Sequence, residues 1–234
     1  MAPTHFMRIL KQIFNCLPYR LQFAVKAAKY HREIKAELFR SPEKEFYFLC
    51  RVIQEGDWVL DVGANIGHYT LEMARLCGDV GRVIAFEPVP ETFAYLVSNI
   101  RFGGFSNVTA LNVGCSDVTN MFGVLIPQWE SGGDNLYQAH FVDEDKSSLL
   151  ALAVAIDNLQ LPGVIRLVKI DAEGHDLNVL YGMKNMLDRD HPIIIIECHA
   201  KEVRSFMHAR GYSCTSHDGS PNLIFQFPSS SLGT

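Results

Sequence analysis

The chain has 234 residues, 48% of them hydrophobic, and a formal net charge of −5 at pH 7. A chain of this length and composition can bury a full core, so we expect a soluble globular protein with one main domain. Its longest uninterrupted apolar run, Leu149 to Ile156, is too short to cross a bilayer, which excludes a membrane-spanning helix in this sequence.

The N-terminus and the cysteines indicate the compartment. Basic residues interrupt the apolar stretch at the N-terminus, where a signal peptide has an uninterrupted apolar core. The six cysteines are widely spaced and form no C-x-x-C pair of the kind found in zinc sites. We therefore expect a cytoplasmic protein with reduced cysteines.

Charge divides the chain into two parts. Residues 1–40 contain eight Lys and Arg against two Glu, whereas residues 41–234 contain 13 basic and 24 acidic side chains. Helical spacing of apolar residues predicts two helices in the basic part, Met7–Leu17 and Leu21–Phe39. These helices either pack on the acidic domain as a cap, or contact a membrane surface or an acidic partner.

From residue 41 helical and strand patterns alternate. Ser41 and Pro42 predict a helix that starts with Ser41 as its N-cap and continues to about Glu55. Five strands and three helices then follow in alternation: strands at Trp58–Val62, Arg82–Glu87, Val108–Val113, Val164–Ile170 and Ile193–Cys198, and helices near 67–77, 90–102 and 175–188. This order predicts an α/β fold with a doubly wound, mainly parallel sheet.

The last part of the sequence predicts an antiparallel hairpin. A helix at Glu202–Arg210 precedes two short strands, Tyr212–Ser216 and Leu223–Phe227, which flank a turn at Asp218-Gly219. These strands bring the predicted sheet to seven. A parallel sheet that ends in such a hairpin is typical of class I methyltransferases, whereas the Rossmann sheets of dehydrogenases usually lack it.

Residues 116–162 are an insertion into the alternating pattern. They contain two candidate strands, Asn120–Ile126 and Leu150–Ala155, and a polar loop with Trp129, a candidate for stacking on a ring or sugar. Ligands of open α/β sheets bind outside the carboxyl ends of the strands. The insertion therefore either shapes an acceptor pocket or adds a hairpin that only broadens the sheet.

The turn after the first strand carries the strongest functional signal. Asp61-x-Gly63-x-Asn65-x-Gly67 joins a buried strand to a helix, and its glycines permit a tight turn and a close backbone approach to a ligand. A dinucleotide site has G-x-G-x-x-G here, and an acid ahead of the turn repels phosphate but suits a cation. The local charge therefore favours S-adenosylmethionine, which carries an ammonium and a sulfonium, over NAD.

Glu87 supports the same interpretation. It ends the second predicted strand, about 20 residues past the glycines, where a carboxylate can accept hydrogen bonds from both ribose hydroxyls. The glycines alone would fit an ordinary connection between a strand and a helix. An acid at this distance favours a nucleoside site instead.

Five segments occur in the order seen in FkbM-type methyltransferases, and the chain resembles that family over about residues 55–200. The segments are Val59–Gly67, Phe86–Pro88, Ala155–Leu159, Lys169–Gly174 and Pro192–Glu197. The resemblance implies the class I methyltransferase fold, S-adenosylmethionine as the methyl donor and a hydroxyl of a small molecule or sugar as the acceptor. His175 departs from the small or apolar residue expected in the family, and residues 1–50 lie outside the match.

The resemblance also implies a cofactor site, position by position. The methionine part is lined by the turn and the start of the next helix, the ribose is held by the acid after the second strand, and Pro88 borders the adenine. Ser116 and Asp117 are candidates for the adenine amino group, although Asp117 equally suits a turn. The full set is Asp61, Gly63, Ala64, Asn65, Gly67, His68, Tyr69, Glu87, Pro88, Ser116, Asp117 and Asp171.

The candidate catalytic residues follow the fourth and fifth strands. We expect Asp171 beside the sulfonium and the acceptor, and Glu173 or His199 to take the proton of the acceptor hydroxyl. Capping of a helix N-terminus also explains at least one acid among Asp171, Glu173 and Asp176. A divalent ion could be ligated by the acids and histidines Asp171, Glu173, His175, Glu197 and His199, but such groupings are common at strand ends, and we predict no metal.

Two other classes of function remain open. An NAD-dependent oxidoreductase would explain the sheet and Glu87, but not the acid ahead of the glycines or the hairpin. A non-catalytic cofactor-binding adaptor would act through the basic N-terminal helices. Nucleic acid is not expected as a substrate, because the main domain is acidic and lacks a basic stripe with interleaved aromatic residues.

Overall fold

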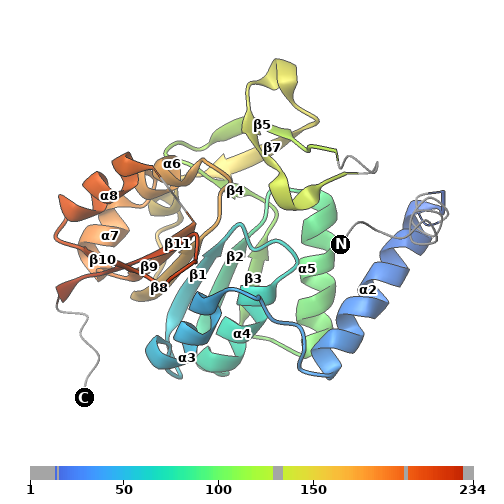
Figure 1. The fold of residues 1–234 in the computed structure, drawn as a ribbon, viewed down its shortest axis with the longest axis horizontal. Helices are drawn as coiled ribbons and strands as arrows, with labels where there is room; N and C mark the ends of the chain where they lie inside the picture. The colour runs from blue at the N-terminus through green and yellow to red at the C-terminus, as the bar shows by residue number, and fades with distance from the viewer. Residues whose placement is uncertain (1–13, 15, 129–133, 198–199, 229–234) are drawn as a thin grey trace.

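A seven-stranded sheet forms the centre of the molecule (Figure 1). The computed structural model describes residues 14, 16–128, 134–197 and 200–228. The sheet order is β10-β11-β9-β8-β1-β2-β3. All neighbours are parallel except β11, which is antiparallel to both β9 and β10. The strands are β1 (Trp58–Val62), β2 (Arg82–Phe86), β3 (Val108–Leu111), β8 (Ile165–Ile170), β9 (Ile193–Glu197), β10 (Ser213–Ser216) and β11 (Asn222–Gln226). The predicted mainly parallel sheet with a C-terminal antiparallel hairpin is confirmed.

Helices cover both faces of this sheet. Successive residues of each strand point to opposite faces, and the apolar side chains on both faces are buried under helices. On one face, Val59 of β1 packs with α3 and α4. On the other, Leu60 of β1 packs with α6, α7 and α8. The helices are α2 (Tyr19–Lys35), α3 (Leu49–Val52), α4 (His68–Cys77), α5 (Pro90–Gly103), α6 (Asp176–Tyr181), α7 (Lys184–Asp190) and α8 (Lys201–His208).

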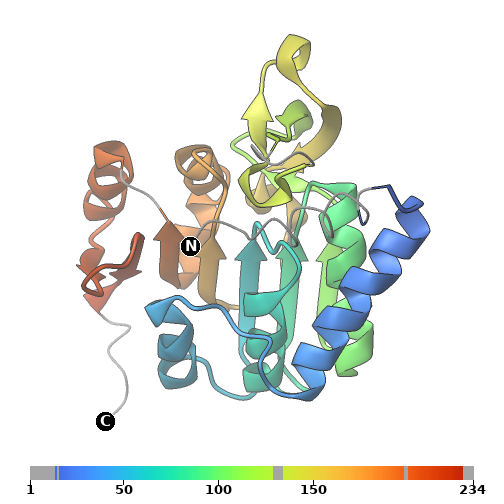
Figure 2. The ribbon, with the colours of Figure 1, turned by 45° about the vertical axis from the view of Figure 1, so that its right-hand side comes forward.

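The insertion forms three strands of a second sheet, and Gly114–Cys115, just before the insertion, forms the fourth. The strand order of this sheet is β4-β7-β5-β6, with β4 at Gly114–Cys115, β5 at Asn120–Leu125, β6 at His140–Val142 and β7 at Leu149–Val154. Figure 2 shows this sheet above the carboxyl ends of the main strands. The alternative that the insertion broadens the main sheet is therefore wrong, and the two short strands β4 and β6 were not predicted.

The basic helix α2 packs on the edge of the domain, alongside α5 (Figure 1). The ring of Phe23 stacks on Tyr95 with a centroid distance of 4.6 Å, and Lys26 Nζ lies 3.6 Å from Glu91 Oε1. The helix ends at Lys35 and not at Phe39 as predicted, because Glu37 adopts a left-handed conformation with φ of 58°. No helix in the described part of the chain is long and apolar enough to span a bilayer. The first predicted helix, at 7–17, falls largely outside the described residues.

Two predicted helices are broken. In place of one helix from Ser41 to Glu55, a 3₁₀ helix (Lys44–Phe48) leads into α3, since Pro42 and an extended Glu43 (ψ 142°) delay the start. Ser41 caps no helix, and its Oγ accepts the N–H of Glu43 instead.

The predicted helix at 175–188 divides into α6 and α7 around Gly182. A Cβ at this glycine would lie 1.9 Å from the carbonyl oxygen of Ser116. Because residue 182 has no Cβ, the connection after β4 can contact the backbone between α6 and α7. The helix predicted at 202–210 is present as α8, one residue earlier at its start and two residues shorter at its end.

Candidate active site

The turn between β1 and α4 lies against the ends of both neighbouring strands. The N–H groups of Gly63 and Ala64 donate to the carbonyl oxygen of Phe86 in β2, each at 3.0 Å. On the other side, the N–H of Asp171 donates to the carbonyl oxygen of Val62. Gly63 has φ of 77°, and a Cβ there would lie 1.9 Å from the Asp171 carbonyl oxygen. Only glycine fits at this position of the turn. We call the turn at residues 63–67, at the carboxyl ends of the strands, the cradle.

Glu87 is held by the backbone on both sides. Its Oε2 accepts the N–H of Asn65, and its Oε1 accepts the N–H of Val89, both at 2.9 Å. The side chain is only 5% exposed, and this burial raises the pKa of Glu87 to about 7 despite the two donors. The carboxyl group therefore has a fixed orientation and an incomplete set of charge-stabilising partners.

Asp61 lies deeper in the structure than Glu87. It is 1% exposed, and Thr70 Oγ1 donates to its Oδ2 at 2.5 Å. Burial raises the pKa of Asp61 to about 6, against the effects of Thr70 and the Lys169 charge. The hydrogen bond ties β1 to the first turns of α4, so Asp61 shapes the cradle from below.

A pocket opens where the two sheets meet. Its floor comes from the ends of main-sheet strands, and its roof comes from the second sheet and the loop before β6. The floor includes Val62, Gly63, Asn65, Glu87, Pro88, Val89, Asp171, Ala172 and Glu173, and the rest of the lining is Gly114, Cys115, Val124, Leu136, Ala139, His140 and Phe141.

The structure brings together six of the predicted site residues in this lining. They are Gly63, Asn65, Glu87, Pro88, Asp171 and Glu173. The other described members of the predicted set, which are Asp61, Ala64, Gly67, His68, Tyr69, Ser116 and Asp117, lie outside the lining. His199 and Trp129 fall outside the described residues.

His68 and Tyr69 face the segment that precedes β1. The His68 ring lies 4.3 Å from the ring of Phe39, and Tyr69 Oη donates to Glu43 Oε2 at 2.6 Å. Both side chains therefore anchor this segment to α4.

Ser116 and Asp117 join a polar group beside the pocket. Ser116 Oγ lies 2.8 Å from His175 Nε2 and 3.0 Å from Asp117 Oδ1, and Asn178 Nδ2 donates to the same carboxylate oxygen. The His175 ring packs against Phe141, and burial lowers the pKa of His175. His175, which differs from the small or apolar residue expected in the family, thus links α6 to the second sheet.

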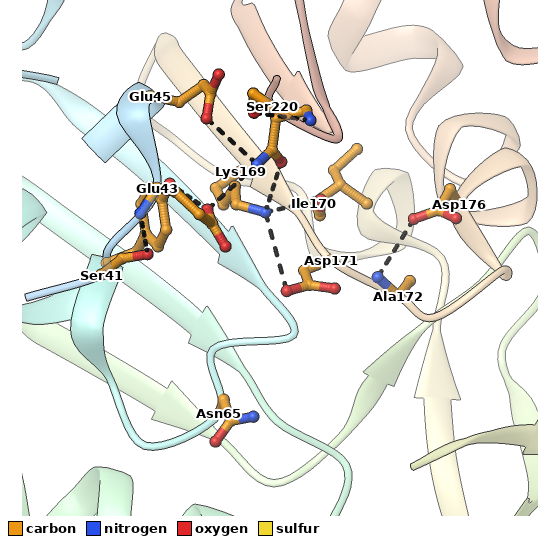
Figure 3. A network of polar contacts seen from close by, with 12 residues as sticks. Ser41, Glu43, Glu45, Asn65, Lys169, Ile170, Asp171, Ala172, Asp176 and Ser220 are labelled. Carbon is orange, nitrogen blue, oxygen red and sulfur yellow. Dashed lines mark hydrogen bonds and ion pairs between the residues drawn. The ribbon is translucent and has the colours of Figure 1, made fainter. Parts of the chain in front are cut away.

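Asp171 faces a buried cation. Lys169 is 2% exposed, and its Nζ lies 3.9 Å from Asp171 Oδ2 and donates to Asn222 Oδ1 at 3.3 Å (Figure 3). Glu43 and Glu45, from the segment before β1, also approach Asn222. A lysine directly after the apolar residues Leu167 and Val168 of β8 was the sequence signal for this network, and the sequence analysis did not use it.

Glu173 closes the floor of the pocket in a left-handed conformation, with φ of 48°. Partial burial, followed by the charges of Asp171 and Glu197, raises the pKa of Glu173 to about 7. Near neutral pH this carboxyl group can therefore either accept or donate a proton. No group of three or more His, Cys, Asp or Glu side chains in the described residues is arranged to hold a metal ion.

Comparisons with known proteins agree with this geometry. The model of the methyltransferase FkbM domain matches residues 61–214. Hexuronic acid methyltransferase AglP of Haloferax volcanii is 30% identical over 186 residues, which cover 78% of this chain and 72% of AglP. Methyltransferase 1 of Beauveria bassiana is 26% identical over 159 residues, 58% of this chain and 61% of that protein.

Solved structures show the same fold. The FkbM methyltransferase of Methylobacillus flagellatus aligns with a TM-score of 0.58 and 18% identity over 80% of this chain, which spans about half (48%) of that chain. A methyltransferase of Geobacter sulfurreducens aligns with a TM-score of 0.51 and 15% identity, over 97% of this chain and 99% of the other. With its glycine turn, buried Glu87 and seven-stranded sheet, the chain has the class I methyltransferase fold and belongs to the FkbM methyltransferase family.

Proposed function

We propose that the protein transfers a methyl group from S-adenosylmethionine to a hydroxyl of a small molecule or sugar. The observation that carries this proposal is Glu87, a buried carboxyl group fixed by two backbone donors at the floor of an open pocket. Hydroxyl donors of a ribose would supply the partners that its charged form lacks.

The residues present fit this cofactor. Gly63 and Asn65 offer backbone beside the methionine part, Glu87 suits the ribose, and Pro88 and Val89 give an apolar border for the adenine. Asp171, on the same floor, suits a positively charged sulfur. When bound, S-adenosylmethionine supplies an electrophilic methyl group, so the protein has mainly to hold the acceptor in line and accept its proton.

The roof of the pocket supports a sugar or another small acceptor. Phe141 and Leu136 give it an apolar surface, and His140 adds a polar group. An aromatic ring with a few polar groups suits the mixed faces of a sugar. The relative named as a hexuronic acid methyltransferase supports the same acceptor class.

A dinucleotide is disfavoured by the same lining. Asp171 and Glu173 place two carboxyl groups beside the glycine turn, where a pyrophosphate would meet like charge. The antiparallel β10–β11 hairpin is likewise atypical of dehydrogenase sheets. An adaptor without catalysis would need neither the acceptor pocket nor its acid–base groups.

Incubation of the full chain with methyl-tritiated S-adenosylmethionine and a panel of p-nitrophenyl glycosides tests the proposal. We expect label in a glycoside, with the new ether located by mass spectrometry. A chain that binds the donor but labels no hydroxyl acceptor would contradict the acceptor class. A chain that does not bind the donor would contradict the cofactor.

A further inference from the structure

We infer that His140 is the general base that removes the proton from the acceptor hydroxyl. The inference rests on the proposed function, because a neutral hydroxyl acceptor has to lose its proton to such a base. His140 was not among the residues predicted from the sequence.

The fold brings His140 to the acceptor side of the site. It begins β6, where it pairs with Leu125 of β5. It lines the same pocket as Asp171 and Glu173, which follow β8 of the other sheet. An acceptor held between the two sheets therefore has an imidazole on its roof side and carboxylates on its floor side.

A backbone contact sets the tautomer of the ring. His140 Nδ1 lies 2.9 Å from the carbonyl oxygen of Gln138, and a carbonyl oxygen can only accept. Nδ1 therefore carries the hydrogen in the neutral ring, and Nε2 carries the lone pair. A neutral imidazole with a fixed, unprotonated nitrogen is the form that a general base requires.

Among the described residues, Asp171 and His175 are less suited to this role. Asp171 is paired with the buried Lys169 ammonium, and His175 Nε2 is engaged by Ser116 outside the pocket lining. Glu173 faces the pocket, and the His140 charge opposes the rise in the pKa of Glu173, which places the two groups within electrostatic reach. Glu173 is thus suited to stabilise the imidazolium that forms when His140 takes a proton.

The step balances in atoms and electrons. A lone pair of the acceptor oxygen forms the bond to the methyl carbon, and the carbon–sulfur bond breaks with its electron pair left on sulfur. The hydroxyl proton moves to His140 Nε2 and then to solvent. No oxidant, reductant or further reactant is needed.

The first test is His140→Asn, measured in the full chain with p-nitrophenyl β-D-glucoside as the acceptor probe. Asparagine keeps a donor for the Gln138 carbonyl but has no basic nitrogen. We expect kcat to fall at least about 100-fold, while the dissociation constant of S-adenosylhomocysteine stays within about twofold. Exogenous imidazole should restore part of the kcat of His140→Ala, which a purely structural role of the ring would not produce.

The matched control is His208→Asn. His208 Nδ1 also lies 2.9 Å from a carbonyl oxygen, that of Tyr212, but it is in α8, away from the pocket. We expect its kcat to stay within about twofold of that of the unmodified chain. An active chain whose His140→Asn variant keeps more than half of kcat would overturn the role of His140 while leaving the proposed function intact.

A readout independent of activity is the tautomer itself. Long-range proton–nitrogen spectra of the ¹³C,¹⁵N-labelled chain, with the ring signals of His140 assigned through its own backbone resonances, should show His140 protonated at Nδ1. Protonation of the neutral ring at Nε2 would overturn the inference, even if every His140 variant failed to fold. If the unmodified chain methylates no hydroxyl acceptor, the proposed function fails, and the inference fails with it.

Discussion

The N–H of Asn65 donates to Oε2 of Glu87 at 2.9 Å, so the turn after β1 is fastened to the acid after β2. The glycine turn and the candidate ribose-binding group therefore act as one unit. Any ligand that binds Glu87 also contacts a turn whose shape depends on that carboxyl group.

This relationship predicts that cofactor binding releases a proton. Burial raises the pKa of Glu87 to about 7, so the group is largely protonated at pH 6.5. Ribose hydroxyls that donate to the carboxylate favour its charged form and lower the pKa. We expect titration with S-adenosylhomocysteine at pH 6.5, in buffers of different ionisation enthalpy, to show net release of up to about one proton, which fades above pH 8.

The matched variants for this prediction are Glu87→Gln and Asp61→Asn. Glu87→Gln should abolish most of the proton release and weaken binding roughly 10- to 100-fold, the effect of a lost hydrogen bond to a charged group. Asp61→Asn should retain the release, since Asp61 lies outside the pocket lining. Proton uptake at pH 6.5 would show that the sign of the linkage is wrong.

Gly63→Ala should disrupt the cradle. The added Cβ would meet the Asp171 carbonyl oxygen at 1.9 Å, and the left-handed φ of 77° adds strain. We expect a loss of at least about 3 kcal/mol in the free energy of unfolding by urea, and loss of S-adenosylhomocysteine binding.

Gly219→Ala separates the strain of the left-handed conformation from the contact with the Asp171 carbonyl oxygen. Gly219 has a similar φ of 75°, but nothing lies within 4 Å of the position of its Cβ. It should lose only the roughly 1–2 kcal/mol of left-handed strain and retain binding. Equal effects of the two substitutions would show that the contact with Asp171 does not shape the site.

Lys169→Met should destabilise the protein and disturb Asp171. The substitution removes the ammonium from a buried network and leaves the oxygens of Ile170 and Asn222 without this donor. We expect the free energy of unfolding to fall by about 3 kcal/mol. Lys35→Met, at the exposed end of α2, should cost less than about 1 kcal/mol. A Lys169→Met variant as stable as the unmodified chain would show that the network contributes little.

The charge of the lining predicts the charge of the acceptor. The described lining has three carboxyl groups and no Lys or Arg. At pH 8 we expect kcat/KM for p-nitrophenyl β-D-glucoside to exceed that for the β-D-glucuronide about 10-fold, and Glu173→Gln to narrow the gap. A preference for the glucuronide would show that the carboxyl groups of the lining do not select against an acidic sugar.

Much of the fold was predictable from local patterns. Continuous apolar strands such as Ile193–Ile196 are buried on both faces, and this pattern, together with the alternation of strands and helices, predicts a parallel sheet. The glycine turn and Glu87 were predictable for a related reason, because their chemistry lies in residues adjacent in sequence to the strands. Their grouping follows from the sheet order.

The second sheet and the break in the helix predicted at 175–188 could not be predicted from local patterns. β4 and β6 have two and three residues, too few for a periodic pattern, and they gain their partners from β7 and β5. The break at Gly182 depends on contact with Ser116, which is 66 positions away in the sequence. His140 was missed for the same reason, since only the second sheet brings it over Asp171 and Glu173.

The central claim is that S-adenosylmethionine binds at the carboxyl ends of β1 and β2. Titration calorimetry of the full chain with S-adenosylhomocysteine and with NADH tests it most directly. We predict saturable binding of S-adenosylhomocysteine at one site, at least 10-fold weaker binding in Glu87→Ala, and no heat with NADH. No heat on addition of S-adenosylhomocysteine, or an unchanged affinity for it in Glu87→Ala, would contradict the assignment of this site.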